Sequence, residues 1–238
     1  MRTTNTTGRS TDRELPATGR GGRGFGAWKK AAQQSGGGQE YNDFEVKEGK
    51  KYVVAFPEDG PLEVVWVHWV PTADDKGRSY DTPRNCPKTR DEDADCPLCA
   101  VARYDKRLEA KPTAYFNVID LDEPAKVFLW RAGKDATNQL DKLFDELQAI
   151  PAERGGPLEL NSPGVYAVVS KARKGGKSGG PFVYSVQRVK ERDLDEDYDL
   201  EPLDPAEIEA VLGDLYDSSV IRYSSAEDLK ELADAVED

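Results

Sequence analysis

The chain has 238 residues, a formal net charge of −12, and 37% hydrophobic against 33% charged residues. This length can bury a substantial core and favours one domain with flanking segments over two full domains. The low hydrophobic fraction predicts disordered flanks around an ordinary folded centre. No apolar run approaches the roughly 18 residues that span a bilayer, and no apolar signal segment follows the amino terminus. We therefore expect no membrane insertion and, with only three cysteines, a reducing cytoplasmic location.

Charge is unevenly distributed along the chain. Residues 1–38 have seven basic and two acidic side chains, a balance of +5, whereas residues 191–238 have three basic and eighteen acidic ones, a balance of −15. The body between them carries −2. The expected organisation is a disordered basic Gly/Arg-rich arm (1–40), a folded core (41–190) and an acidic C-terminal tail with short helices (191–238). The acidic total therefore does not exclude a nucleic-acid ligand.

The amino-terminal arm contains two features of its own. Residues 20–26, RGGRGFG, resemble Arg/Gly segments that associate with single strands through charge and stacking, although a solvated tail would have the same composition. A short helix candidate follows at residues 27–34, too short to fold alone. Its Trp28, Lys29 and Lys30 could contact DNA or a neighbouring subunit, which predicts self-association on DNA as one role of the arm.

From residue 50 onward the pattern is that of β-strands. β-Branched and aromatic residues fill 51–56 and 62–70, separated by the turn-forming residues 57–60. A loop (71–99), a helix (98–110), a hairpin (114–121 with 126–131), an amphipathic helix (138–150) and a last hairpin (164–170 with 182–189) follow. This order predicts a mainly β protein with added helices. Its expected architecture is an OB-fold-like five- or six-stranded barrel with an inserted zinc-binding loop subdomain at about 68–110.

A metal site is the strongest single prediction of the sequence. His68 is the only histidine, and the three cysteines of the chain, Cys86, Cys96 and Cys99, lie within fourteen residues of one another. Cys₃His is one of the usual ligand sets for tetrahedral Zn²⁺, and a two-residue gap allows one tight turn to offer both thiolates to one ion. Four protein ligands leave no open position for a water. We therefore expect one structural zinc ion.

Other roles for the cysteines fit the sequence less well. They could be reduced structural thiols, or one disulfide with a thiol left over, but they lie in a charged, proline-bearing segment with no evident core. A redox CxxC is expected beside a βαβ pattern, which is missing. A nucleobase deaminase needs H-x-E and P-C-x-x-C, whereas Val70 stands two residues after His68 and Asp95 precedes Cys96.

Aromatic and basic residues of the core predict a nucleic-acid surface. Single strands are bound by bases stacking on exposed rings beside a cationic groove. Tyr115 and Trp130 are the favoured rings because Lys111 and Arg131 lie beside them, although a buried position in the core is the commoner role for any one such ring. The segment 171–180 between the last two strands has four cations, no acid and four glycines, and its Lys171, Arg173, Lys174 and Lys177 are expected phosphate contacts in a loop.

The acidic tail contains an acidic run at 193–202 and helix candidates at 205–216 and 226–236. A solvated tail is the simplest interpretation, and the helical periodicity of its later part argues against it. A tethered charge of −15 would imitate phosphate at high local concentration, so we expect it to compete with DNA for a basic groove.

These residues together resemble the T4-type bacteriophage single-stranded DNA-binding (helix-destabilising) proteins. The resemblance spans roughly residues 50–190. It depends on His68 with Cys86-x9-Cys96-Pro-Leu-Cys99, on Lys111 with residues 115–119, and on residues 126–133 leading into the helix at 140–150. It implies an OB-fold, a zinc subdomain with one His and three Cys, and DNA contacts at Tyr115, Trp130, Arg131 and Lys111. It also implies an acidic tail that recruits replication and recombination proteins. The longer spacing between His68 and Cys86 and the acidic zinc loop depart from the family pattern.

The function expected from the sequence is sequence-nonspecific binding of single-stranded DNA, which protects and organises it in phage replication, recombination and repair. No nucleophile–base pair, phosphate-binding glycine motif or open metal site is evident, so we expect no enzyme. The alternative is a zinc-stabilised protein-interaction module that recruits replication partners through its acidic tail. A binder of duplexes or RNA and a zinc hydrolase with an exchangeable ligand position are further alternatives.

Overall fold

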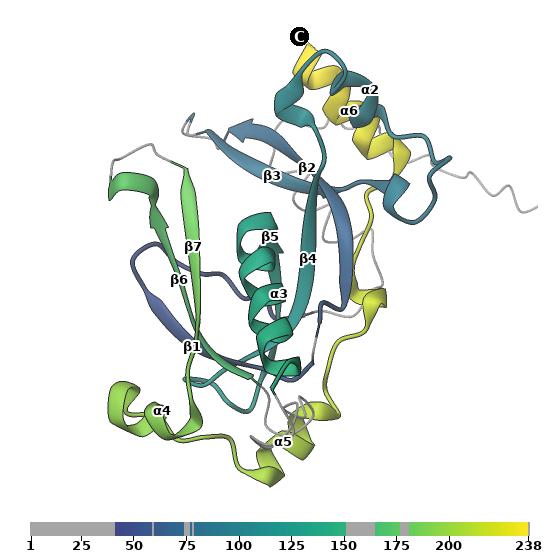
Figure 1. Cartoon of the computed structure of the whole chain (residues 1–238). Helices are drawn as coiled ribbons and strands as arrows, with labels where there is room; N and C mark the ends of the chain where they lie inside the picture. Colours follow the sequence, from purple (N-terminus) through teal and green to yellow (C-terminus); the bar gives the residue numbers. More distant parts are fainter. Residues whose placement is uncertain are drawn as a thin grey trace, which may run out of the picture.

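The computed structural model of the chain describes residues 41–58, 60–73, 77, 79–150, 165–176 and 181–237. Within this part, seven strands form one curled antiparallel sheet in the order β3-β2-β4-β1-β6-β7, with β5 paired to β4 (Figure 1). The strands are β1 (Lys51–Phe56), β2 (Glu63–Ala73), β3 (Ser79–Asn85), β4 (Lys111–Asp120), β5 (Val127–Gly133), β6 (Val165–Arg173) and β7 (Phe182–Arg188). The helices are α2 (Pro97–Val101), α3 (Lys134–Gln148), α4 (Glu191–Tyr198), α5 (Pro205–Leu212) and α6 (Ala226–Glu237).

Strand β4 explains why the sheet curls. One of its edges pairs with β5, and its other edge is divided between β2 near its start and β1 near its end. Because β2 and β1 pair with successive parts of the same edge of β4, the sheet bends around the side chains on its inner face. Phe116 of β4, Trp130 of β5 and Val169 of β6 meet on the inside, where all three are buried. The result is a half-barrel consistent with an OB-like fold, which confirms the predicted mainly β class.

Helix α3 covers the open side of this half-barrel. Its buried residues Ala136, Leu140, Leu143, Phe144 and Leu147 recur at intervals of three or four, so one face meets the core. The amide side chain of Gln139 donates to the Tyr184 carbonyl at 2.9 Å and accepts from the Val186 N–H at 2.9 Å. Asp135 accepts from the Tyr184 N–H at 3.2 Å. The helix therefore pairs with the backbone of β7 through its side chains.

We expect replacement of Gln139 by alanine to lower the free energy of unfolding by about 1–3 kcal/mol, because two backbone groups of β7 lose their partner. Urea denaturation measures the difference. Gln148→Ala is the matched control, since that side chain is exposed at the end of the same helix. A surface substitution of this kind should change the free energy by less than about 0.5 kcal/mol. Equal losses in the two variants would contradict the role of Gln139.

The outer face of the sheet is covered by residues that follow β7. Leu194 of α4, Leu203 before α5 and Val211 of α5 are buried against Val53 of β1 and Val168 of β6, together with other residues of the sheet. Figure 1 shows α4 and α5 at one end of the sheet and α6 beside α2 at the other. The region predicted as an acidic tail thus supplies apolar side chains to the core, while its acidic side chains face outward along α4.

Three local expectations differ from the structure. Residues 79–85, predicted as loop, form the edge strand β3, which pairs with β2. An edge strand can contain Pro83 because it has a neighbour on one side only, and a proline has no N–H to donate. The helix predicted at 98–110 is shorter, since α2 ends at Val101 and a separate turn begins after Asp105, whose side chain accepts from the Arg107 N–H. Strand β6 continues to Arg173, so Lys171 and Arg173 lie on a strand rather than in a loop.

Candidate metal centre and nucleic-acid surface

Four predicted metal ligands converge at the end of the sheet formed by β2 and β3. His68 lies within β2, opposite Arg84 of β3, and Cys86 directly follows β3. The Cys86 N–H donates to the Trp66 carbonyl at 2.7 Å, which keeps this cysteine beside β2. Cys96 precedes α2 and Cys99 lies within it, because Pro97 at the first helical position begins a turn between them. The hairpin and the helix therefore bring the four side chains together.

The distances among these side chains suit a single tetrahedral ion. The His68 Nε2 atom lies 3.4 Å from the Cys96 sulfur and 3.5 Å from the Cys99 sulfur, and the sulfurs of Cys86 and Cys99 are 3.6 Å apart. All four ligand atoms lie within 4.8 Å of one another. Zinc bond lengths in tetrahedral geometry require about 3.8 Å between two sulfurs and about 3.5 Å between sulfur and nitrogen. The group can therefore hold a metal ion, as predicted.

The second nitrogen of His68 is also fixed. Its Nδ1–H donates to the Leu108 carbonyl at 2.6 Å, so the lone pair of Nε2 points toward the cysteines. His68 and the surrounding Leu98, Leu108 and Leu229 are each fully buried. A metal ion at this position would be shielded from water on that side, as in structural sites.

The geometry of the three cysteines suits metal ligands rather than a disulfide. All three are free, and the 3.6 Å between Cys86 and Cys99 is far longer than the roughly 2.05 Å of an S–S bond. Hydrogen bonding with Cys86 is the largest cause, and burial the second, of a rise in the pKa of Cys96 to about 12. Hydrogen bonding from Cys96 in turn lowers the pKa of Cys86. A metal ion would displace the proton of the hydrogen bond between the Cys86 and Cys96 side chains, because only thiolates act as ligands.

Both aromatic rings that were predicted to stack on bases are buried. Trp130 is 2% exposed and lies in the core against Phe44, Phe56 and Phe116. Tyr115 is 4% exposed on the opposite face of the sheet, where its hydroxyl donates to the Asn85 side chain at 3.2 Å. Neither ring is presented to a ligand in this conformation, so DNA contact at these two positions stays a prediction that needs a rearrangement.

The predicted cations lie at several places around the half-barrel. Lys111 is exposed at the start of β4, and Arg131 is half-buried on β5 next to Tyr115 in the register. Lys171 and Arg173 project from β6, and Lys174 is exposed at the turn that follows. Four predicted contacts lie outside the described residues, namely Lys177 and, in the amino-terminal arm, Trp28, Lys29 and Lys30.

The hairpin of β6 and β7 combines cations with an exposed ring. The Lys171 ammonium lies 4.8 Å and the Arg173 guanidinium 4.3 Å from the ring centre of Phe182. Arg173 also pairs with Glu48 at 3.3 Å. The Phe182 side chain remains 44% exposed. This hairpin therefore presents an apolar ring and positive charge side by side, the two components of a single-strand-binding surface.

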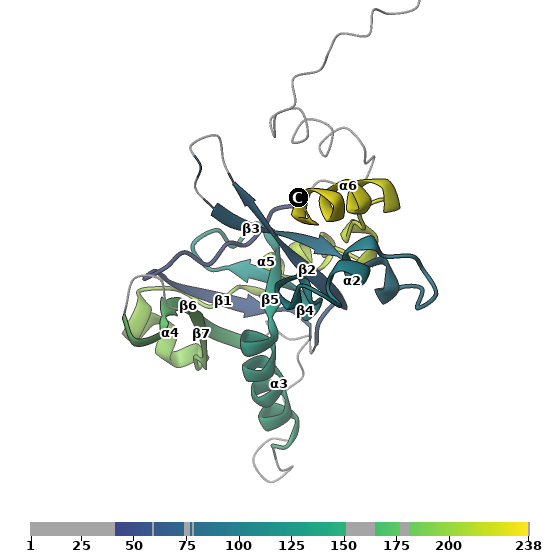
Figure 2. The same cartoon turned by 90° about the horizontal axis from the view of Figure 1, so that it is seen from above.

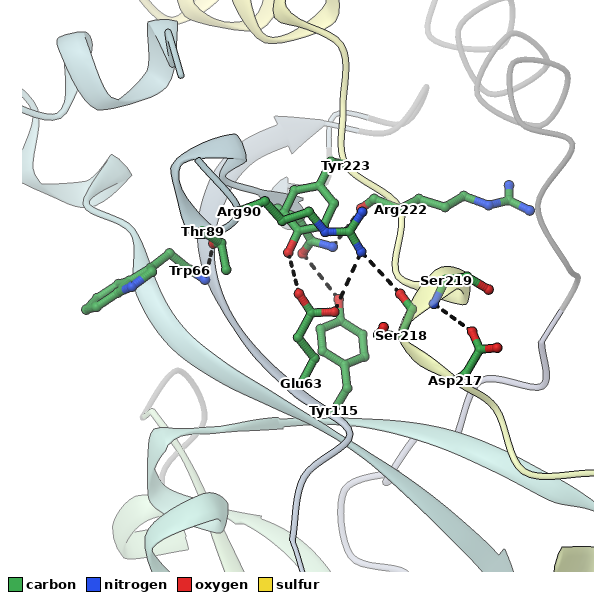
Figure 3. Close-up of polar contacts among 11 residues, drawn as sticks. Glu63, Trp66, Thr89, Arg90, Tyr115, Asp217, Ser218, Ser219, Arg222 and Tyr223 are labelled. Atoms are coloured by element: carbon green, nitrogen blue, oxygen red, sulfur yellow. Dashed lines mark hydrogen bonds and ion pairs between the residues drawn. The ribbon is translucent and has the colours of Figure 1, made fainter. Parts of the chain in front are cut away.

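Trp66 is a second exposed ring, 49% accessible in the middle of β2. Figure 3 shows its side chain pointing away from Tyr115 and Glu63. Trp66 is not among the residues predicted to bind DNA, although the sequence contains a signal for its exposure. Val65 and Val67 are fully buried on one face, so strict alternation places Trp66 on the other, next to Val64, which is also 49% exposed. Phe182 is also absent from the predicted residues, for a different reason. It is the first residue of β7, so no earlier residue of the strand indicates which face of the sheet its side chain occupies.

Fold and site together define a class: an OB-like β half-barrel with a His/Cys₃ group able to hold a metal ion. No model of a known protein family matches the chain, and no curated protein matches it. In the part of the chain that the structure describes, no helix is both long and apolar enough to cross a lipid bilayer.

Proposed function

We propose that this protein binds single-stranded DNA without sequence preference, and that it protects and organises such DNA during replication, recombination or repair. The observation that carries the proposal is the hairpin of β6 and β7, where Lys171 and Arg173 lie within 5 Å of the exposed ring of Phe182. Bases of any identity stack on aromatic rings, and phosphates are bound by nearby cations. The loop between strands 4 and 5 of an OB-fold is one of the loops that bind oligonucleotides, and the hairpin of β6 and β7 is proposed to act in the same way here.

We further propose that the metal ion is one structural Zn²⁺ held by His68, Cys86, Cys96 and Cys99. Three thiolates and one imidazole form a donor set that favours zinc over hard cations such as Mg²⁺ or Ca²⁺. With four protein ligands the ion has no open coordination position. Its contribution is to tie the segment between Cys86 and Cys99 to β2, and so to stabilise the shape of the protein beside the sheet.

Fluorescence anisotropy with labelled oligo(dT) of about 16 nucleotides, the upper site size of an OB-fold, tests the proposal. We expect binding that weakens steeply with salt, and much weaker binding of a duplex of equal length. Lys171→Gln should reduce the slope of log K against log salt by about 0.7, the value for one lost contact with a single strand. Lys126→Gln is the matched control, because that lysine pairs with Glu123 in the turn between β4 and β5. Equal affinity for both DNAs, or none, would refute single-strand binding.

A further inference from the structure

Residues 214–237, here named the C-terminal strap, cross the outer face of the sheet and return to the metal-binding end. The strap first contacts β4, where the Asn117 side chain donates to the Tyr216 carbonyl at 3.0 Å and accepts from the Tyr216 N–H at 3.1 Å. Val220 and Ile221 then pack on Val65 and Tyr115, where they complete a buried cluster. The strap is therefore what covers the face of β4 that contains Tyr115.

Arg90 fastens the strap to the segment between the first two cysteines. Its guanidinium donates to the Ser218 carbonyl at 3.2 Å and lies 4.4 Å from the ring centre of Tyr223 (Figure 3). It also lies 3.7 Å from a carboxylate oxygen of Glu63, whose other oxygen accepts from the Tyr223 hydroxyl at 2.9 Å. One arginine thus contacts two points of the strap and the strand beneath it.

Asn85 adds a second polar attachment next to the metal ligands. Its side chain donates to the Arg222 carbonyl at 2.7 Å and accepts from the Tyr115 hydroxyl at 3.2 Å. Asn85 ends β3, where it pairs with Val67 of β2, and it directly precedes Cys86, so this attachment of the strap lies one residue from a proposed metal ligand. A small polar cavity of about 190 Å³ remains between the strap and the sheet at this point.

Helix α6, the end of the strap, makes the apolar attachment. Figures 1 and 2 both place it beside α2. Leu229 and Ala233 of α6 are buried in the same cluster as Leu98 and Val101 of α2, and Cys86 and Cys96 belong to this cluster as well. The strap therefore packs directly on the side chains that surround the metal site.

All three attachments depend on residues 85–101, the segment whose conformation the metal ion would fix. Arg90 lies between two ligands, Asn85 precedes one, and α2 contains one. We propose that metal binding and docking of the strap are coupled: the ion holds the strap on the sheet, and the docked strap in turn slows loss of the ion. Such coupling is necessarily reciprocal, and typical values change affinity about 5- to 150-fold. This inference depends on the proposed zinc site, and it does not depend on DNA binding.

The test compares Arg90→Gln with Arg107→Gln, a control in the same region, where Arg107 pairs with Asp105. Both arginines are at least half exposed, so neither change should prevent folding. Zinc content is measured first, and the release of zinc to a colorimetric chelator is then followed with time. Changes in affinity among variants of one binding site lie mainly in the dissociation rate. A coupling of about 5-fold or more in affinity therefore predicts release from Arg90→Gln about 5-fold or more faster than from the native chain, with Arg107→Gln unchanged.

Hydrogen exchange of residues 214–237, read by mass spectrometry, gives the reciprocal measurement. We expect faster exchange in Arg90→Gln, and faster exchange in the native chain after chelation. Absence of zinc from the purified native protein would refute the metal site itself, and the coupling with it. Stoichiometric zinc with equal release from both variants, or an equally protected strap after chelation, would refute the coupling and leave the metal site intact.

Discussion

Replacement of Cys96 by serine is expected to reduce bound zinc from one ion per chain to nearly none and to unfold the region around α2. The serine hydroxyl is not a thiolate, and the remaining three ligands would bind the ion far more weakly. Structural zinc contributes an apparent 10–16 kcal/mol in zinc-finger peptides at neutral pH, so even partial loss of that term exceeds the effect of ordinary surface substitutions. Elemental analysis after gel filtration measures the zinc, and thermal unfolding measures the stability.

Asp95→Asn is the control for that prediction. It changes the neighbouring residue and removes an exposed carboxylate without touching a ligand, so zinc content and melting temperature should stay near those of the native chain. Chelation of the native protein should reproduce the lower melting temperature of Cys96→Ser, because both treatments remove the same ion. If Cys96→Ser kept a full complement of zinc, the assignment of this ligand would be wrong.

The four residues that could hold a metal ion could all be predicted from sequence because the chain offers so few alternatives. It has one histidine and three cysteines, and Cys96 and Cys99 have the spacing of a single turn. The strand that contains His68 was also predictable from its β-branched residues. What the sequence could not show is the partner of Nδ1. That partner is the Leu108 carbonyl, which lies forty residues away and has no side-chain signature.

The stacking residues were harder to predict because burial depends on segments far apart in the chain. Tyr115 and Phe116 are adjacent and point to opposite faces of β4, so alternation alone would place one of them away from the core. Both are buried, because Phe116 meets the core under α3 and Tyr115 lies under the strap. The strap residues Val220 and Ile221 are about a hundred positions away from Tyr115, and an acidic segment gives little local sign that it will cover a sheet. A neighbouring cation cannot distinguish a covered ring from an open one.

Strand β3 was missed for a local reason. Its sequence, SYDTPRN, lacks alternation of apolar residues and contains a proline, so it has the composition of a loop. Pairing with the longer β2 determines its structure, and an edge strand needs only one set of backbone hydrogen bonds. The hairpin nevertheless has a functional consequence, since its register places Cys86 beside His68.

Replacement of Trp66 by alanine is expected to weaken binding of oligo(dT) by about 5- to 150-fold, because a stacked base contributes about 1–3 kcal/mol. The ring is half exposed on the face of β2 opposite Tyr115, so its loss should cost the fold little. The prediction depends on the proposed single-strand binding and on stacking at this particular ring. Anisotropy titrations of native and variant chains at one salt concentration measure the change.

Tryptophan fluorescence identifies which ring is stacked. The chain has four tryptophans, and we expect most of the quenching caused by oligo(dT) to disappear in Trp66→Phe. Trp69→Phe is the matched control, because Trp69 lies on the opposite face of the same strand, partly buried with Val65 and Val67. Quenching that persists in Trp66→Phe and disappears in Trp69→Phe would place the DNA on the face now covered by the strap. The covered ring of Tyr115 would then become the better candidate for stacking, and the strap would have to leave the sheet before DNA could bind.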